Sequence, residues 1–142
     1  MNDTNNPFLG SWELESWSAE HPTGEIVFPY GTDPIGRISY DANGQMAVQI
    51  MKNHRSKFHS EDPLQSEVHE AIAAYHDFMA YCGYYNVNAE SNQVVHKITI
   101  SSFPNWIGQN QVRNYKFSNR KLILTTDPIG TLCHKLVWNN QA

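Results

Sequence analysis

The chain has 142 residues, a formal net charge of −4 and 17% charged residues. This length suits one domain with a single core, and the acidic balance argues against a nucleic-acid partner, because phosphate contacts need clustered cations. Aromatic residues make up 12% of the chain, which excludes a disordered protein. No apolar run approaches the roughly 20 residues of a membrane span.

These limits predict a single domain over 1–142, in which residues 1–7 form a flexible tail. The first residues show no basic region followed by an apolar stretch, so we expect no secretory signal and a cytoplasmic location. Cys82 and Cys133 match no zinc-binding spacing and are expected to remain reduced thiols.

From residue 10 onward, most of the chain has the pattern of short β-strands. Trp12 and Leu14 alternate with Glu13 and Glu15, which is typical of a strand with one buried face. The Asn-Gly pair at 43–44 predicts a hairpin turn. The predicted strands, in chain order, are 10–18, 25–28, 36–40, 45–51, 83–88, 93–101, 110–118, 121–125 and 131–138.

One helix is predicted in the middle of the chain, over 67–82. Ser66 can cap its start and Gly83 can end it. Its apolar residues recur at helical spacing and form one stripe. The stripe consists of Val68, Ala71, Ile72, Tyr75, Met79 and Cys82.

About eight to nine short strands with one helix favour a mainly β fold, either a closed antiparallel β-barrel or a sandwich. Closure into a barrel removes exposed strand edges. A barrel of about eight strands has an interior that fits packed side chains or one small ligand. The strand pattern therefore leads to the hypothesis that the barrel interior binds one small ligand.

Strand alternation predicts which polar side chains face the interior. His96 shares a face with Val94, Ile98 and Ile100, and Arg113 shares a face with two aromatic residues of its strand, Tyr115 and Phe117. On the last strand, the residues that share a face are His134, Leu136 and Trp138.

An interior Arg113 keeps its charge and needs a partner, because an unpaired buried charge costs several kcal/mol. The neighbouring strands offer no evident Asp or Glu. Tyr hydroxyls, carbonyls, His96 or a bound ligand remain as partners. The alternatives are an Arg113 that extends to the barrel mouth and stacks on Tyr115, and a His96 that is simply a hydrogen-bonded interior residue.

The Gly-Ser-Trp at 10–12 matches the Gly-x-Trp signature of the first strand in lipocalin-type barrels. A more specific likeness is carried by the segments 29–40, 43–49, 81–85, 103–108, 111–113 and 136–138. Together these segments resemble small bacterial and fungal lipocalin-like domain proteins, and the likeness extends over about 8–139. The resemblance implies a closed lipocalin-like barrel with an apolar cavity and a helix packed on or over it.

Common catalytic and metal-binding motifs are not present. His69-Glu70 begins like a zinc-binding His-Glu-x-x-His helix, but Ala73 stands where the second His is needed. No Gly-x-Ser-x-Gly or phosphate-binding loop occurs. We therefore predict no metal and no cofactor.

The function predicted from these observations is binding of a small, largely apolar molecule with a polar or anionic end. The alternative is a cofactor-free isomerase or cyclase in which His96 and Arg113 are catalytic by acid–base chemistry. A packed barrel that serves as an interaction module is a third hypothesis, and a homodimer is left open. Tyr75 and Met79 are predicted to form a lid. The predicted ligand-binding residues are Tyr40, Tyr75, Met79, His96, Asn105, Trp106, Arg113, Tyr115 and Trp138.

Overall fold

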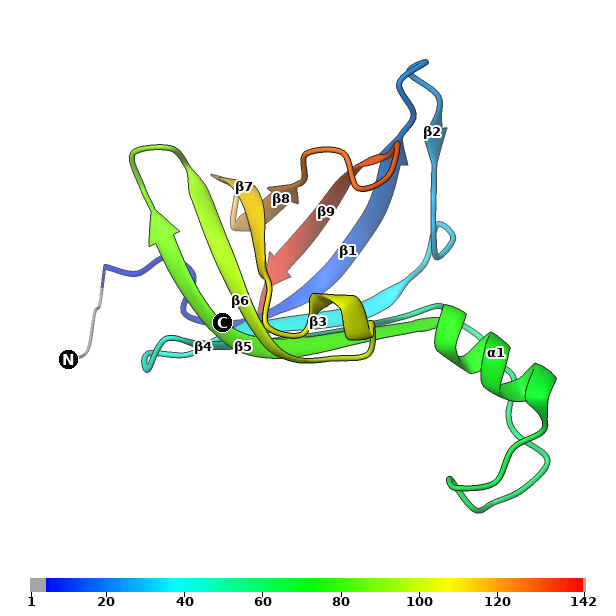
Figure 1. Ribbon diagram of the computed structural model, residues 1–142. Coiled ribbons are helices and arrows are strands. Elements are labelled where there is room, and N and C mark those ends of the chain that lie inside the picture. Colours follow the sequence, from blue (N-terminus) through cyan, green and yellow to red (C-terminus); the bar gives the residue numbers. More distant parts are fainter. Residues whose placement is uncertain (1–4, 142) are drawn as a thin grey trace.

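Nine antiparallel strands curve around a central space in the computed structural model, which describes residues 5–141 (Figure 1). The strand order is β2-β1-β3-β4-β5-β6-β7-β8-β9, and β1 also pairs with β9. The strands are β1 (Gly10–Glu20), β2 (Ile26–Val27), β3 (Ile35–Tyr40), β4 (Gln45–Met51), β5 (Phe78–Asn88), β6 (Gln93–Ser101), β7 (Asn110–Ser118), β8 (Lys121–Thr125) and β9 (Cys133–Asn140).

The β1–β9 pairing closes the sheet into a barrel, because both long edges of β1 are engaged. Along one edge β1 pairs with β3, and along the other it pairs with β9 from Trp12 to Glu20. The short β2 pairs only with the end of β1 and adds to the barrel without belonging to the closed ring. The predicted mainly β, closed antiparallel barrel is confirmed.

A β-bulge changes which residues of β6 face the interior. In β6, Val94, His96 and Ile98 are buried as predicted, but Ile100 is 67% exposed. The pairing with β5 slips by one residue between Gly83↔Ile98 and Cys82↔Ile100, so the prediction for Ile100 was wrong. A Cβ atom at Gly83 would lie 1.9 Å from the Lys97 carbonyl oxygen, which explains the glycine at this close approach.

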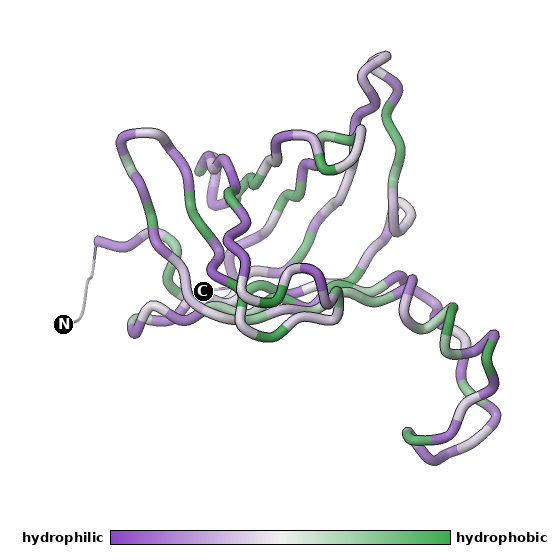
Figure 2. Tube along the Cα trace, in the orientation of Figure 1, coloured by the Kyte–Doolittle hydropathy of each residue, from purple (hydrophilic) through white to green (hydrophobic). Residues whose placement is uncertain are grey.

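The mid-chain helix α1 (Val68–His76) is shorter than predicted and none of its residues is buried. It extends away from the barrel with hydrophobic and hydrophilic positions intermixed (Figures 1 and 2). Glu67, not Ser66, caps its start, and the Glu70 carboxylate accepts a 2.9 Å bond from the Glu67 N–H. Met79 and Cys82 belong to β5, so the prediction of a helix over 67–82 was wrong beyond His76.

One end of the barrel is filled by the side chain of Phe8, which comes just before β1. The Phe8 ring centroid lies 5.1 Å from that of Tyr40, 4.9 Å from Tyr115 and 5.0 Å from Phe117. Its carbonyl oxygen accepts a 2.9 Å bond from Trp12 Nε1. We call these five aromatic residues the aromatic plug. Of the predicted tail over 1–7, residues 1–4 lie outside the described residues, and Asn6 Nδ2 donates a 2.8 Å bond to the Tyr85 hydroxyl.

Candidate functional site

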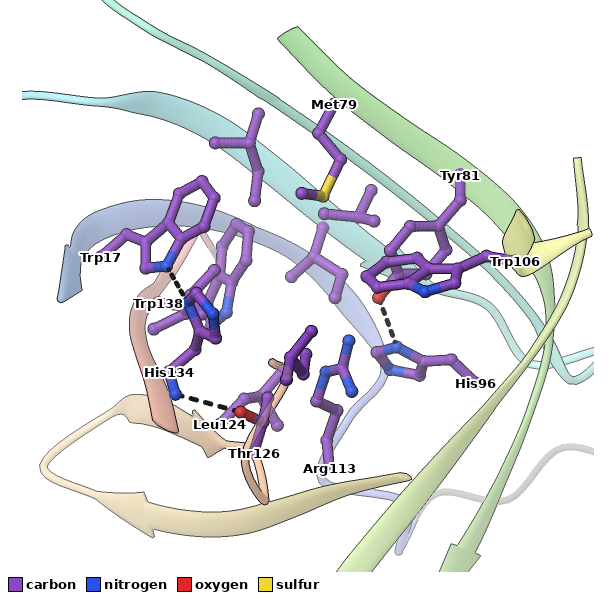
Figure 3. A pocket seen from close by; sticks show the side chains of 15 residues that line it. Trp17, Met79, Tyr81, His96, Trp106, Arg113, Leu124, Thr126, His134 and Trp138 are labelled. Atoms are coloured by element: carbon purple, nitrogen blue, oxygen red, sulfur yellow. Dashed lines mark hydrogen bonds between the residues drawn. The ribbon is translucent and has the colours of Figure 1, made fainter. Parts of the chain in front are cut away.

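An apolar cavity of about 150 Å³ lies within the barrel. Its walls come from most of the barrel strands, from the 3₁₀ helix η1 (Pro104–Trp106) and from the segment between β8 and β9 (Figure 3). Ile129 in that last segment is 38% exposed, so the cavity approaches the surface there. The lining residues are Trp17, Ile38, Val48, Ile50, Met79, Tyr81, His96, Trp106, Arg113, Leu124, Thr126, Ile129, His134, Leu136 and Trp138.

His96 is held between two tyrosine hydroxyls. Its side chain is 1% exposed, with Nε2 2.7 Å from the Tyr40 hydroxyl and Nδ1 2.8 Å from the Tyr81 hydroxyl. A neutral imidazole has one N–H and one acceptor nitrogen. One hydroxyl therefore donates to His96 and the other accepts from it, which leaves the accepting tyrosine with a proton for a further acceptor.

Burial keeps this hydrogen-bonded group uncharged. Desolvation, followed by the positive charge of Arg113, lowers the pKa of His96 from 6.5 to about 3. Burial likewise raises the pKa of the Tyr40 and Tyr81 hydroxyls, although Arg113 opposes the increase at both. At neutral pH, His96 is a neutral imidazole between two neutral phenols.

Arg113 is the buried charge of the cavity and is 8% exposed. Its Nη1 donates to the Val112 carbonyl oxygen at 3.1 Å and lies 3.5 Å from Gln111 Oε1. The guanidinium carbon lies 5.7 Å from the centroid of the Trp106 ring, a cation–π contact. Within residues 5–141, Arg113 forms no salt bridge with a carboxylate. The alternative in which Arg113 reaches solvent and stacks on Tyr115 does not describe this arrangement.

Two further polar groups line the cavity on the β9 side. His134 Nδ1 accepts a 2.9 Å bond from Trp17 Nε1, so a neutral His134 carries its proton on Nε2 (Figure 3). Burial and the charge of Arg113 lower the pKa of His134. Trp138 is 1% exposed, and its Nε1 is a buried donor without a hydrogen-bond partner among the described residues.

The structure brings five of the predicted site residues to the cavity wall: Met79, His96, Trp106, Arg113 and Trp138. The other four lie elsewhere. Tyr40 contacts His96 but does not line the cavity, and Tyr115 belongs to the aromatic plug. Tyr75 lines a separate hollow beside η1, at the end of α1. Asn105 is exposed on η1. Because Met79 lies on β5 and Tyr75 on α1, these two residues do not form one helical lid.

Sequence reasoning missed Tyr81 and Trp17 as cavity residues. Tyr81 was assigned to the helix, although the aromatic run at 81–85 is a β signal. Trp17 lies beyond a bulge in β1, where pairing with β9 shifts between Leu14 and Ser16. After this shift odd-numbered residues face inward, so alternation continued from Trp12 would place Trp17 on the outer face.

Among residues 5–141, possible metal ligands lie close together at the start of α1, where Glu67 and His69 are exposed and Glu70 is partly exposed. Glu70 already accepts bonds from the N–H groups of Glu67 and His59, and these bonds lower its pKa. Helix capping accounts for the arrangement.

Within the described part of the chain, no helix has the length and apolar character that a membrane-spanning segment requires.

We predict that Tyr40→Phe lowers the free energy of unfolding by about 1–2 kcal/mol, because it leaves one nitrogen of a buried imidazole without its partner. Urea denaturation followed by circular dichroism measures the change. The matched control is Tyr84→Phe, since Tyr84 is exposed. Equal effects at both positions would show that the buried hydroxyl does not support His96.

The fold and the site together define a small closed β-barrel with an internal, apolar, partly polar-lined cavity. The family profile described as "lipocalin-like domain" matches residues 9–140, and the chain belongs to this family. The chain is also 28% identical over 87 residues to the 4'-hydroxy-3'-methoxypropiophenone carrier protein of Aspergillus oryzae. That match covers 57% of this chain and 78% of the relative. Fold, cavity and family membership support small-molecule binding.

Proposed function

We propose that this protein binds one small, largely apolar molecule inside the barrel, a single aromatic ring with a polar end, and carries it unchanged. The observation that carries the proposal is the cavity itself, in which apolar walls surround the buried donors of Arg113, Tyr81 and Trp138. Few polar groups in an apolar cavity are typical of small-molecule sites. The residues proposed to contact the ligand are Met79, Tyr81, His96, Trp106, Arg113 and Trp138.

Cavity size supports an aromatic ring as the apolar part. The volume is about 150 Å³, and an engineered apolar cavity of about this size accepts benzene. Trp106 and Trp138 offer ring faces and edges for aromatic contacts. The relative from Aspergillus oryzae is named as a carrier of an aryl ketone, a ligand of the same chemical class.

The site favours binding over turnover. Both nitrogens of His96 already contact tyrosine hydroxyls, and its pKa of about 3 makes it a weak base at neutral pH. The isomerase or cyclase alternative needs His96 to exchange a proton with the ligand. The present arrangement instead suits a group that holds Tyr81 in position.

Isothermal titration calorimetry with 4'-hydroxy-3'-methoxypropiophenone tests the proposal. A matched pair of variants locates the binding: Val48→Phe adds a ring inside the cavity, whereas Val112→Phe adds one on the exposed face of β7. We expect Val48→Phe to weaken binding at least about tenfold, because it fills the space that the ligand needs. Val112→Phe should bind as the wild type does.

Chromatography of the ligand after prolonged incubation separates carrying from catalysis. Recovery of unchanged ligand supports a carrier, while a rearranged or cyclised product would show that the protein is an enzyme. Equal loss of binding in both phenylalanine variants, or no binding by the wild type, would contradict the cavity as the site.

A further inference from the structure

We propose that the cavity binds its aromatic ligand as an oxyanion, with the ionised oxygen on the guanidinium of Arg113. This inference rests on the proposed function, because it specifies the chemistry of the ligand's polar end. The ligand class is an acidic aromatic molecule, such as a phenol or an aryl carboxylic acid, and the protein selects its deprotonated form.

The first support is that Arg113 forms no salt bridge with a carboxylate in the described part of the chain. Its side chain is more than nine-tenths buried and lines the cavity. Its partners are the Val112 carbonyl, the Gln111 amide oxygen, the Trp106 ring and the Tyr81 hydroxyl. These neutral partners leave a full positive charge in a site of low polarity, which is costly unless a negative group pairs with it. A guanidinium is also the side chain best shaped to hold an oxyanion.

The second support is that the other groups in the cavity wall carry no charge at physiological pH. Among residues 5–141, no Asp or Glu lines the cavity. Both lining histidines, His96 and His134, have lowered pKa values, with burial as the main cause and Arg113 as the second. They are neutral at physiological pH, so Arg113 determines the electrostatic potential in the cavity.

The third support is the surplus of hydrogen-bond donors. Trp138 Nε1 is buried without an acceptor among the described residues, and an indole N–H can only donate. The Tyr81 hydroxyl has a proton for the ligand whenever it accepts from His96 Nδ1. A ligand oxygen near Arg113 would favour this orientation, because it would accept the Tyr81 proton beside the positive charge of the guanidinium. The cavity therefore complements an electron-rich oxygen and not a donor group.

The test measures the ionisation of a bound phenol by its absorbance. The phenolate of 4'-hydroxy-3'-methoxypropiophenone absorbs at longer wavelength than the phenol, so a pH titration reports its pKa free in solution and in the complex. We expect the bound phenol to ionise at least about one pH unit lower than the free one, which corresponds to a tenfold preference for the anion. A bound pKa equal to the free value, or above it, would overturn the inference.

The methyl ether 3',4'-dimethoxypropiophenone separates this inference from the proposed function, since it has the same ring and cannot ionise. Above the pKa of the free phenol, where the ligand is ionised both in solution and in the complex, we expect the ether to bind at least about tenfold more weakly than the phenol. Equal binding of ether and phenol would contradict the anion preference and leave the carrier function standing. If neither compound binds, both proposals fail.

Variants then assign the effect to the guanidinium. Arg113→Met keeps the apolar stem without the charge, and we expect it to abolish the pKa shift while retaining affinity for the methyl ether. Arg37→Met removes a surface arginine that pairs with Glu13 and should leave the shift unchanged. Benzoate against benzamide provides a second anion and neutral pair on wild-type protein, so the result does not depend on the folding of any variant. Loss of the shift in Arg37→Met, or its persistence in Arg113→Met, would contradict the assignment to Arg113.

Discussion

Replacing Phe8 with alanine should lower the free energy of unfolding by about 3–5 kcal/mol, the usual cost of deleting a buried phenyl ring. Phe8 is fully buried and contacts the rings of Tyr40, Tyr115 and Phe117 at one end of the barrel. Neighbouring strands cannot close over the space that its ring would leave, because each is fixed in the closed sheet.

Chemical denaturation of Phe8→Ala against wild type measures this change. Phe28→Ala serves as control, because Phe28 lies in an exposed position after β2, where truncation should cost less than about 1 kcal/mol. A similar loss in both variants would mean that Phe8 contributes no more than a surface ring.

Contacts between four side chains connect the aromatic plug to the cavity wall. Phe8 packs edge-on against Tyr40, the Tyr40 hydroxyl contacts His96, and His96 contacts Tyr81 in the cavity wall. Each group restricts the next, so the residue that precedes β1 helps to hold a cavity donor in place. A preorganised binding site requires such contacts, which fix the residues that touch the ligand.

Stability should decrease as the pH falls from about 6.5 towards 3, because His96 resists protonation in the folded state. Its pKa is lowered from 6.5 to about 3, by burial first and by the Arg113 charge second. Across this interval the unfolded chain binds a proton at residue 96 and the folded protein does not, so acid favours unfolding. Each pH unit then costs about 1.4 kcal/mol. The lowered pKa of His134 acts in the same direction.

Urea unfolding at about pH 7 and about pH 4.5 compares wild type with His96→Gln, whose amide keeps a donor and an acceptor but cannot titrate. We expect the variant to lose less stability than wild type between these two conditions. His69→Gln, at an exposed position on α1, should behave as wild type. An undiminished pH dependence in His96→Gln would show that His96 is protonated at similar pH in both states.

Local pattern predicted the strands well where alternation is regular. His96 and Arg113 were assigned to the interior from their neighbours, and both are buried. The same rule failed at Ile100, and if continued from Trp12 it would also misplace Trp17; each of these residues lies beyond a bulge. A bulge adds one residue to a strand, and its position depends on the partner strand, so alternation within a single segment cannot reveal it.

The end of the helix could not be predicted for a similar reason. The apolar stripe continues past His76 to Met79 and Cys82, and intrinsic preferences do not separate the last helical turn from a strand. Pairing with β4, which begins at Phe78↔Met51, places these residues in β5. The hydrogen bonds of this ladder outweigh a helical pattern that has no surface to pack on.

Sequence alone therefore determined the mainly β class, the interior location of the two polar residues and the absence of common catalytic motifs, because these follow from residue type and spacing. The choice of a barrel over a sandwich came from the resemblance to lipocalin-like proteins. Tertiary structure decided which side chains meet: the pairing of His96 with Tyr40 and Tyr81, the aromatic plug around Phe8, and the cavity beside Arg113. These contacts join strands that are distant in the chain. Their geometry depends on how the barrel closes and where its strands are offset, which no short stretch of residues specifies.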